Sequence, residues 1–516
     1  MVNQLILLFA ISLMGIISVP TARAQSSAAV AEAIQNYRVA NERQILADFA
    51  DLLALPNVAD NLDDMQANAE HIASLMEQRG FDTRILNAGN APYVYGEMLS
   101  AAATDTLLIY AHFDGQSVQP ENWTHPPFTP TLLDGPVQDG GQPVDIASVE
   151  GEFDPEWRIY ARSAGDDKMP IIALMHVIDA MRKAGIEPSV NIKLLFDGEE
   201  ERGSPTVLPL LEEHRDLLTA DLMLFCDGPM HQSRQAQLVF GVRGGLNFDI
   251  TSYGATHPLH SGHYGNWAPN PIMRLSYLLT SMRAEDGRIL IDGFYDDVAL
   301  LGEAERAAIE AMPNIEDTLR EELAVHTPEG SGARIEELIT RPALNVRGIV
   351  AGGVGAQGRN IVLSAATTAI NMRLVPDQQP DDVRELIEAH IRNEGYHIVY
   401  DEPSVETLLG HEKVVKLDWR GNGYPGLRTA LDHPMSRRLI GLLREIRPEL
   451  IITPSMGGGL PLHAFDAVLD IPIIILPLAN HDNNQHAEDE NLRLQNLWDA
   501  MEIYGVVLAG FADRAD

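Results

Sequence analysis

Directly after the strand-like run 190–196, which alternates at first and is fully apolar from Leu194, four carboxylates stand within five residues: Asp197, Glu199, Glu200 and Glu201. Like charges this close repel one another unless they are protonated or face a cation. An isolated acidic run is most often a solvated loop. In this chain, however, four other strand-like runs also lead into side chains that can bind metal, and all five could converge at one end of a sheet. The pattern therefore indicates a metal site.

The candidate ligands just past these strand ends are two imidazoles and three carboxylates: His112, Asp166, Glu201, Asp227 and His486. This set suits borderline divalent metals, Zn²⁺ above all, with Co²⁺ or Mn²⁺ as alternatives. Three carboxylates exceed what one catalytic zinc ion needs, so we expect two Zn²⁺ ions bridged by one carboxylate. Glu200 is adjacent to a ligand but is not one itself, which makes it the candidate general base for an attacking water.

Asp114 follows His112 by two residues, and residues two apart in a strand point to the same side. A carboxylate in that place suits the residue that orients a metal-binding histidine. A His-x-Asp pair by itself is more often a surface pair, so the role of Asp114 depends on the other candidate ligands.

The first half of the chain alternates strand-like runs with helical patterns. The strand-like runs are 93–98, 106–111, 157–160, 190–196 and 222–226, and the helical patterns are 29–55, 67–79, 170–183 and 207–218. This alternation predicts an α/β domain with a mixed, mostly parallel sheet, in which ligands bind beyond the carboxyl ends of the strands. The same domain resumes later with a helix at 434–446, a strand at 471–476 and a helix at 491–511.

At 516 residues the chain is long enough for two domains. The pattern changes near residue 242. A strand at 246–253, a helix at 269–282, a strand at 361–374, a helix at 380–393 and a strand at 396–401 follow, with an acidic, irregular segment at 286–339. This order is typical of a ferredoxin-like module. We therefore expect an inserted ferredoxin-like α+β domain at 242–417 and a dizinc catalytic domain formed by 25–241 and 418–516.

The formal net charge is −37 at pH 7, with 74 acidic against 37 basic residues. A surface this acidic repels nucleic acid and anionic lipid, so we expect neither as a partner. The single cysteine, Cys226, permits no intramolecular disulfide. It stands in a strand-like run, where we expect a small core residue.

The apolar run 5–19 is followed by Thr21-Ala22-Arg23-Ala24, with small residues at the two positions that a signal peptidase reads. This predicts a signal peptide at 1–24 and export to a bacterial periplasm or the medium. Residues 1–4 carry no Lys or Arg, which leaves a retained signal anchor as the alternative. No other run approaches the length of a membrane span, so we expect no membrane partner for the mature form.

Seven short motifs follow one another along the chain: His-Phe-Asp at 112–114, Asp-Asp-Lys at 166–168, Glu-Glu-Arg-Gly-Ser at 200–204, His-Ser-Gly at 260–262, Arg-Leu-Val-Pro at 373–376, Gly-Gly-Gly-Leu-Pro at 457–461 and a last histidine at His486. In this order they resemble the co-catalytic zinc metallopeptidases that include carboxypeptidase G, carnosinase and other non-specific dipeptidases, acetylornithine deacetylase and succinyl-diaminopimelate desuccinylase. The resemblance covers nearly the whole mature chain. The fourth ligand position falls on Asp227, and an Asp rather than a Glu there makes the dipeptidase-like branch the nearer one.

The resemblance implies a role for each motif. It makes Asp166 the carboxylate that bridges the metals, Glu200 the base and Glu201 a ligand. It gives the inserted domain the function of a lid and dimerisation domain, from which His260 reaches the active site of the other subunit in a homodimer. It assigns the C-terminal carboxylate of the substrate to Arg373 and to a glycine loop formed by Gly457, Gly458 and Gly459.

The chain departs from the family pattern beside Asp166. Two glycines of the family motif are replaced by Ala161 and Ser163, a third is replaced by Met169, and the loop before Asp166 is longer than usual. The Asn-Glu pair after the last histidine has become Asp489-Glu490. None of these changes removes a ligand, but they leave open the geometry of the loop and the shape of the substrate pocket.

The predicted function is zinc-dependent hydrolysis of the amide bond of a dipeptide or short peptide with a free C-terminal carboxylate. A metal-bridging water would attack, with Glu200 as general base. An N-acyl-amino-acid deacylase is the alternative, because hydrolysis of that amide needs the same residues. An inactive peptide-binding protein is a more remote alternative, since capture of a peptide needs no base and Glu200 is present.

Overall fold

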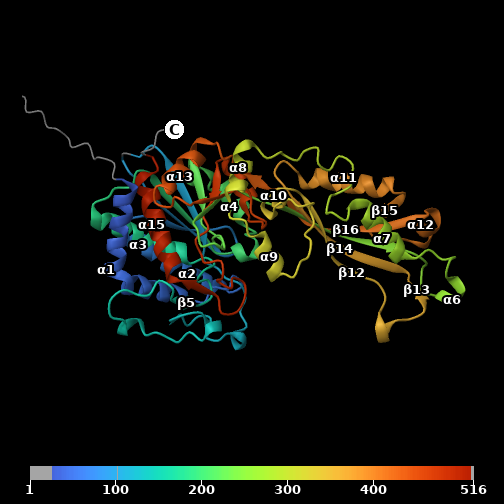
Figure 1. Cartoon of the computed structure of the whole chain (residues 1–516), viewed down its shortest axis with the longest axis horizontal. Helices are drawn as coiled ribbons and strands as arrows, with labels where there is room; N and C mark the ends of the chain where they lie inside the picture. Colours follow the sequence, from blue (N-terminus) through green and yellow to red (C-terminus); the bar gives the residue numbers. More distant parts are fainter. Residues whose placement is uncertain (1–25, 102, 513–516) are drawn as a thin grey trace, which may run out of the picture.

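The computed structural model describes residues 26–101 and 103–512, so the signal peptide predicted at 1–24 lies outside the described residues. Figure 1 shows two bodies along the long axis of the molecule, a larger one that contains α1 (Ser27–Leu53) and a smaller one that contains α11 (Pro380–Asn393). Within the described ranges, no helix has both the length and the apolar composition needed to cross a bilayer.

The larger body is built on an eight-stranded sheet in the order β1-β2-β6-β3-β7-β19-β8-β18. Its strands are β1 (Asp82–Asn87), β2 (Pro92–Met98), β3 (Thr106–His112), β6 (Asn191–Asp197), β7 (Leu222–Phe225), β8 (Gln237–Val239), β18 (Ile451–Thr453) and β19 (Ile473–Ile475). The central strands β6, β3, β7 and β19 run parallel, whereas β1–β2, β2–β6 and β19–β8 are antiparallel pairs. The sheet is mixed and mostly parallel, as predicted, and the carboxyl ends of its central strands meet at one edge.

Helices cover both faces of this sheet. Leu107 and Ile109 of β3 belong to the core formed with α1, α3 (Met169–Ala184) and α15 (Leu494–Gly510), with α2 (Leu62–Gln78) at the β1–β2 end. Leu108 and Tyr110 belong to a second core with α4 (Val207–Glu213), α5 (Arg215–Leu218) and α14 (Leu462–Leu469). Because both faces are buried, the strands are nearly continuous apolar runs. Cys226, directly after β7, is 2% exposed in the first of these cores.

The smaller body is a five-stranded sheet in the order β12-β14-β10-β16-β15. Its strands are β10 (Gly244–Tyr253), β12 (Ala343–Val350), β14 (Ala365–Leu374), β15 (Tyr396–Val399) and β16 (Lys413–Tyr424). Alternate residues of β14, among them Ile370 and Met372, pack against α7 (Pro271–Met282) and α11, whereas Arg373 stands on the opposite, more open face. The order β12-β14-β10-β16 is that of a ferredoxin-like module.

One strand of this module differs from the prediction. The predicted strand 396–401 is the edge strand β15, which runs parallel to β16. The strand beside β10 is β16, and it continues past residue 417 to Tyr424. A division of the chain at 417 would cut this strand, so the division that we propose follows Tyr424. α12 (Val405–Gly410) joins β15 to β16.

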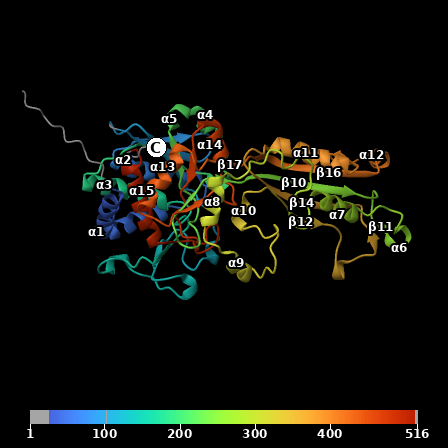
Figure 2. The same ribbon diagram turned by 45° about the horizontal axis from the view of Figure 1, so that its top comes forward.

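Two segments expected to be irregular contain regular elements. The acidic segment 286–339 holds α8 (Glu303–Ala311), α9 (Glu316–Glu322) and α10 (Ile335–Ile339), and α8 packs against β18 of the larger body. Figure 2 shows α8 and α10 between the two bodies. The Pro- and Gly-rich loop before residue 158 contributes β4 (Thr131–Leu133) to a separate three-stranded sheet, with β5 (Arg158–Tyr160) at its centre and β20 (Asn491–Arg493).

The position of β5 corrects one expectation. The prediction placed all five ligand-bearing strands in one sheet, but β5 pairs with β4 and β20 and not with the eight-stranded sheet. Asp166 therefore enters the site from the loop between β5 and α3 and not from the end of a strand of the main sheet. The helix predicted at 491–511 likewise begins at Leu494, because residues 491–493 form β20.

Candidate dinuclear metal site

The candidate ligands come from five neighbouring places at the carboxyl edge of the main sheet. β3 ends at His112, and β7 is followed two residues later by Asp227. β6 leads into the turn that carries Glu201, while Asp166 precedes α3 and His486 lies in the loop between β19 and β20. Parallel strand order thus brings together residues that are far apart in the sequence.

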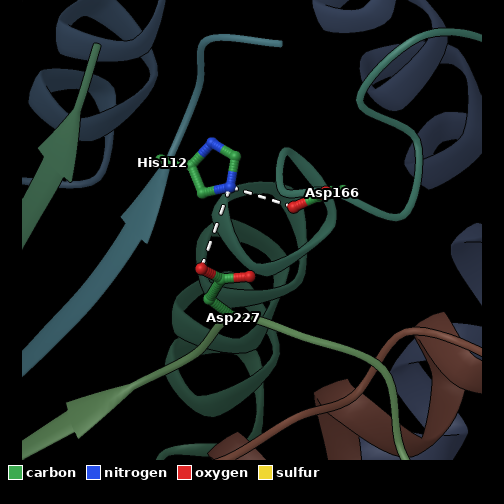
Figure 3. A group of neighbouring side chains, drawn as sticks. All are labelled: His112, Asp166 and Asp227. Carbon is green, nitrogen blue, oxygen red and sulfur yellow. Dashed lines mark hydrogen bonds and ion pairs between the residues drawn. The ribbon is translucent and has the colours of Figure 1, made fainter. Parts of the chain in front are cut away.

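Three of these side chains form a first cluster. The Nε2 atom of His112 lies 3.0 Å from Oδ1 of Asp166 and 4.0 Å from Oδ2 of Asp227. Figure 3 shows the imidazole nitrogen of His112 between the two carboxylates. All three residues are buried, and one ligand atom from each lies within 4.8 Å of the others.

A second cluster uses the other oxygen of the same aspartate. The Nε2 atom of His486 lies 3.1 Å from Oδ2 of Asp166 and 3.2 Å from Oε2 of Glu201. The side chain of His486 is 53% exposed, so this cluster opens towards solvent, whereas the first does not. Asp166 is the only member common to the two metal-capable groups found in the described residues, which makes it the candidate bridging carboxylate of a two-ion site.

The chemistry of the donor set fits two divalent cations. Each cluster offers one imidazole and two carboxylates, which are the ligands of borderline metals. The carboxylates repel one another: burial and the charges of neighbouring carboxylates, partly offset by His112, raise the pKa of Asp227 to about 7. Bound cations would relieve this repulsion.

The carboxylates around the two imidazoles raise the pKa values of both. Burial acts to lower the pKa of His112, but its hydrogen bonds to Asp114 and Asp166 raise that pKa well above the usual value. Hydrogen bonds to Asp166 and Glu201 raise the pKa of His486 to about 10. A metal ion binds only the neutral imidazole, so binding must release protons and must weaken as the pH falls.

Glu200 lies beside both clusters and belongs to neither. Among the described residues, no side chain or backbone group donates a hydrogen bond to its carboxylate, whereas its own N–H donates to Oδ1 of Asp114 at 3.0 Å. Burial, and next the charge of Asp227, raise the pKa of Glu200 well above its ordinary value. A carboxyl group with a raised pKa and no fixed partner is suited to accept and return a proton.

Asp114 connects the candidate ligand His112 to the turn that holds the candidate base. Its Oδ1 atom lies 3.3 Å from Nδ1 of His112, and its two oxygens accept the backbone N–H groups of Glu200 and Glu201, each at 3.0 Å. The contact with Nδ1 leaves Nε2 of His112 directed at Asp166. Asp114 is therefore placed to position both a candidate ligand and the candidate base.

Glu490 holds the loop whose geometry the sequence left open. Its carboxylate accepts the N–H groups of Ser163, Gly165 and Asp166 at 3.0 Å each, and Arg162 Nη1 donates to it at 2.7 Å. Ser163 adopts a φ of 63°, a left-handed conformation that glycine adopts more readily. The loop therefore keeps its shape through four hydrogen bonds to Glu490, a role that the motif pattern alone did not reveal.

Gln116 is a second residue of the candidate site that the sequence analysis missed. Its Nε2 group donates to Oε2 of Glu201 at 2.8 Å, the same oxygen that lies 3.2 Å from His486. The sequence contained one indication of this residue, its spacing, because Gln116 follows Asp114 by two residues just as Asp114 follows His112. The contact fixes the carboxylate of Glu201 in the direction of the metal site.

We expect Gln116→Ala to weaken metal binding by about 10- to 100-fold, because Glu201 then loses the group that orients it. Titration of the metal-loaded protein with a competing chelator measures this affinity. Gln119→Ala is the matched control, since Gln119 is exposed and bonds only to nearby Asn122. Equal affinities for the two variants would contradict the assignment.

Arg373 and the glycine loop approach each other at the junction of the two bodies. Arg373 pairs with Gly245 across β10 and β14, and Tyr424 of β16 pairs with Gly245 from the other side. The ring of Tyr424 reaches the loop, because a Cβ atom added at Gly459 would lie 2.5 Å from its hydroxyl. The carbonyl of Gly458 accepts the N–H of Arg243 at 3.2 Å, and the side chain of Ile339 lies over Gly457.

The structure does not bring His260 to these residues. His260 lies on β11 (Leu259–His260), which pairs with β13 (Ile361–Val362) and precedes α6 (Ser261–Tyr264). Figure 1 places β13 and α6, and Figure 2 places β11 and α6, at the end of the smaller body that is farthest from α1 and α15. His260 is exposed, and its Nδ1 accepts the N–H of Gly262 at 3.1 Å.

Two clusters that share a carboxylate, with an unbound carboxylate beside them at the edge of an α/β sheet, define a metallohydrolase of the dinuclear class. The sequence model described as Peptidase family M20/M25/M40 matches residues 108–509. The chain belongs to this family and is a metallopeptidase, which confirms the resemblance carried by the motifs.

Similar proteins extend along most of the chain. The chain is 23% identical over 464 residues to a Cys-Gly metallodipeptidase of Schizosaccharomyces pombe, covering 88% of this chain and 90% of the relative. It is 25% identical over 436 residues to a Beta-Ala-His dipeptidase of Mus musculus, covering 80% and 78%. A crystal structure of an M20 family metallo-carboxypeptidase from Sulfolobus solfataricus matches with a TM-score of 0.70 and 25% identity, covering 91% of this chain and 99% of that one.

Proposed function

We propose that this metallopeptidase hydrolyses dipeptides or short peptides that carry a free C-terminal carboxylate, and that its two metal ions are Zn²⁺. The observation that carries the proposal is the pair of ligand clusters joined by Asp166, with Glu200 beside them and bound to neither. The relatives named as dipeptidases support the same substrate class. The imidazole and carboxylate ligands support zinc, with cobalt and manganese as ions of similar preference.

Two divalent cations, when bound, would supply a water of lowered pKa and a Lewis acid for the scissile carbonyl. Glu200 takes the proton of the attacking water and gives it to the leaving amine. Asp114 holds Glu200 and Glu201 through their backbone N–H groups, so the base cannot drift from the ligands. The scissile carbonyl develops negative charge, and His260 of a second subunit is our candidate donor to that oxygen.

Arg373 and the glycine loop are our candidates for the C-terminal carboxylate of the substrate. A guanidinium and a row of backbone N–H groups are a natural pair of partners for a carboxylate. Both stand at the junction of the two bodies, where Tyr424 lies between the strand of Arg373 and Gly459. A strongly acidic protein repels an anionic substrate at long range, so local cations must capture it.

A comparison of free and amidated peptides tests this function. We expect a dipeptide with a free C-terminus to be cleaved about 10- to 100-fold faster, in kcat/KM, than its C-terminal amide, because the amide offers no charge to Arg373. Arg373→Ala should remove that preference by slowing the acid far more than the amide. Arg444→Ala, at an exposed arginine of α13 (Pro434–Arg444), is the control. Equal rates for the free acid and the amide in the wild type would contradict this assignment and favour an endopeptidase or an amidase.

We also propose that the enzyme is a homodimer joined through the smaller body. β12 is an edge strand of its sheet, and two of its last residues, Ile349 and Val350, are 56% and 78% exposed. Trp267 and Tyr277 of the same body are 78% and 65% exposed. An unpaired edge with exposed apolar side chains is suited to pair with a second copy of the chain.

For the cellular location, we propose export. The support is the apolar run 5–19 and the small residues before and at Ala24, as described from the sequence. A mature protein whose N-terminal residue is Gln25, identified by mass spectrometry of the exported protein, is the result that this proposal requires.

A further inference from the structure

Arg243 is a buried cation beside the glycine loop. It connects β9 (Gly241–Val242) to β10, and its side chain is only 9% exposed. Its Nη2 group donates to the carbonyl of Arg341 at 2.7 Å, while its buried Nε–H finds no hydrogen-bond partner. Its backbone N–H donates to Gly458, so the residue stands directly against the loop assigned to the substrate carboxylate.

A second guanidinium belongs to Arg373, which pairs with Gly245, two residues further along the chain from Arg243. Burial and the charge of Arg373 lower the pKa of Arg243 to about 10. Among the described residues, no carboxylate forms an ion pair or a hydrogen bond with the side chain of either arginine. In a chain with twice as many acidic as basic residues, two neighbouring arginines without acidic partners are unexpected. A buried charge without a partner is costly, which indicates that a ligand supplies the missing negative charge.

The number of carboxylates on a ligand decides how many of the two guanidiniums it can compensate. A single carboxylate offers one negative charge and would leave one of the two guanidiniums uncompensated. A C-terminal aspartate or glutamate offers two carboxylates on one residue, one for each guanidinium. Guanidinium groups bind carboxylates more strongly than they bind neutral amides, because the hydrogen bonds are charge-assisted.

We propose that Arg243 makes this enzyme selective for substrates whose C-terminal residue is acidic, with Arg373 and the glycine loop holding the α-carboxylate and Arg243 holding the side-chain carboxylate. This inference rests on the proposed peptidase function and names the substrate class of the same site. The alternative is a structural Arg243, whose contact with Arg341 merely holds α10 against the larger body.

Two dipeptides that differ only in the charge of the last side chain test the proposal. The metal-loaded enzyme should cleave Ala-Glu with a kcat/KM at least about tenfold higher than Ala-Gln, because one charge-assisted hydrogen bond accounts for such a factor. Arg243→Met should bring this ratio close to one, whereas Arg243→Lys should retain part of it. Arg437→Met, at an exposed arginine of α13, should keep the wild-type ratio.

Binding of the products separates this inference from the proposed function. Calorimetry should give a dissociation constant for L-glutamate at least about tenfold below that for L-glutamine, and Arg243→Met should remove the difference. If no dipeptide is cleaved, the peptidase proposal fails, but the two product affinities still decide the role of Arg243. Equal binding of glutamate and glutamine, or an Arg243→Met variant that slows Ala-Glu and Ala-Gln by the same factor, would overturn the inference and leave Arg243 a structural residue.

Discussion

Glu200→Gln is expected to lower kcat by at least about 100-fold while both metal ions stay bound. The amide has nearly the same shape as the carboxylate but cannot accept a proton from water. Because Glu200 belongs to neither ligand cluster, its replacement removes no metal ligand. The substitution also removes one charge from a crowded acidic site, in which Asp227 already raises the pKa of Glu200. The folded state should therefore not lose stability.

Glu201→Gln is the matched comparison, one residue along the same turn. Glu201 contacts His486 and forms part of the second cluster, so its amide variant should lose metal as well as activity. Turnover of a dipeptide, metal content by mass spectrometry and thermal unfolding of both variants distinguish the two roles. Near-normal turnover in Glu200→Gln would remove Glu200 as the base, and loss of metal in that variant would make it a ligand.

The sheet that carries the site was predictable because its strands are buried on both faces. The runs before His112 and Asp227 are apolar throughout, and each ends abruptly in a metal-capable side chain. A strand buried on both sides produces this pattern, and parallel order then brings such ends together. The two clusters that share Asp166 consist of the five residues that the sequence suggested.

Short strands and strands with many polar residues were not predicted, because they do not form a continuous apolar run. β16 contains Asp418, Arg420 and Asn422, and its exposed residues hide the alternation that marks a strand. β8 and β18 are three residues long, which is too short for any period to emerge. Their pairing is set by tertiary contacts, as β8 with β18 shows across more than two hundred residues of chain.

The residues that support the metal site could not be predicted from local sequence patterns either. Glu490 binds the loop of Asp166 from a position more than three hundred residues later, and only the folded chain brings the two together. A carboxylate after the last histidine was visible in the sequence, but its partners, the N–H groups of Ser163 and Gly165, were not. A side chain that forms hydrogen bonds with distant backbone groups produces no periodic pattern in the amino-acid sequence.

His260→Ala is expected to be almost inactive as a homodimer, because removal of an oxyanion donor costs about 100- to 1000-fold in kcat. His260 lies on β11, and Figure 2 shows β11 at the end of the smaller body farthest from α1 and α15. If it serves an active site, that site belongs to a second chain. Each active site of such a dimer then combines Glu200 of one subunit with His260 of the other.

Mixed dimers test this arrangement with a gain of activity. When inactive Glu200→Gln and inactive His260→Ala subunits exchange at equal amounts, half of the dimers are hybrids, and one of the two sites in each hybrid has both residues intact. Activity should therefore return to about a quarter of the wild-type rate. A mixture of Glu200→Gln and Glu201→Gln should stay inactive, because those two residues serve the same site from the same chain. Differently tagged subunits establish that exchange has occurred. An exchanged mixture of the first pair that stays inactive would place His260 outside the active site of the partner, and the exposed β11 would then need another explanation.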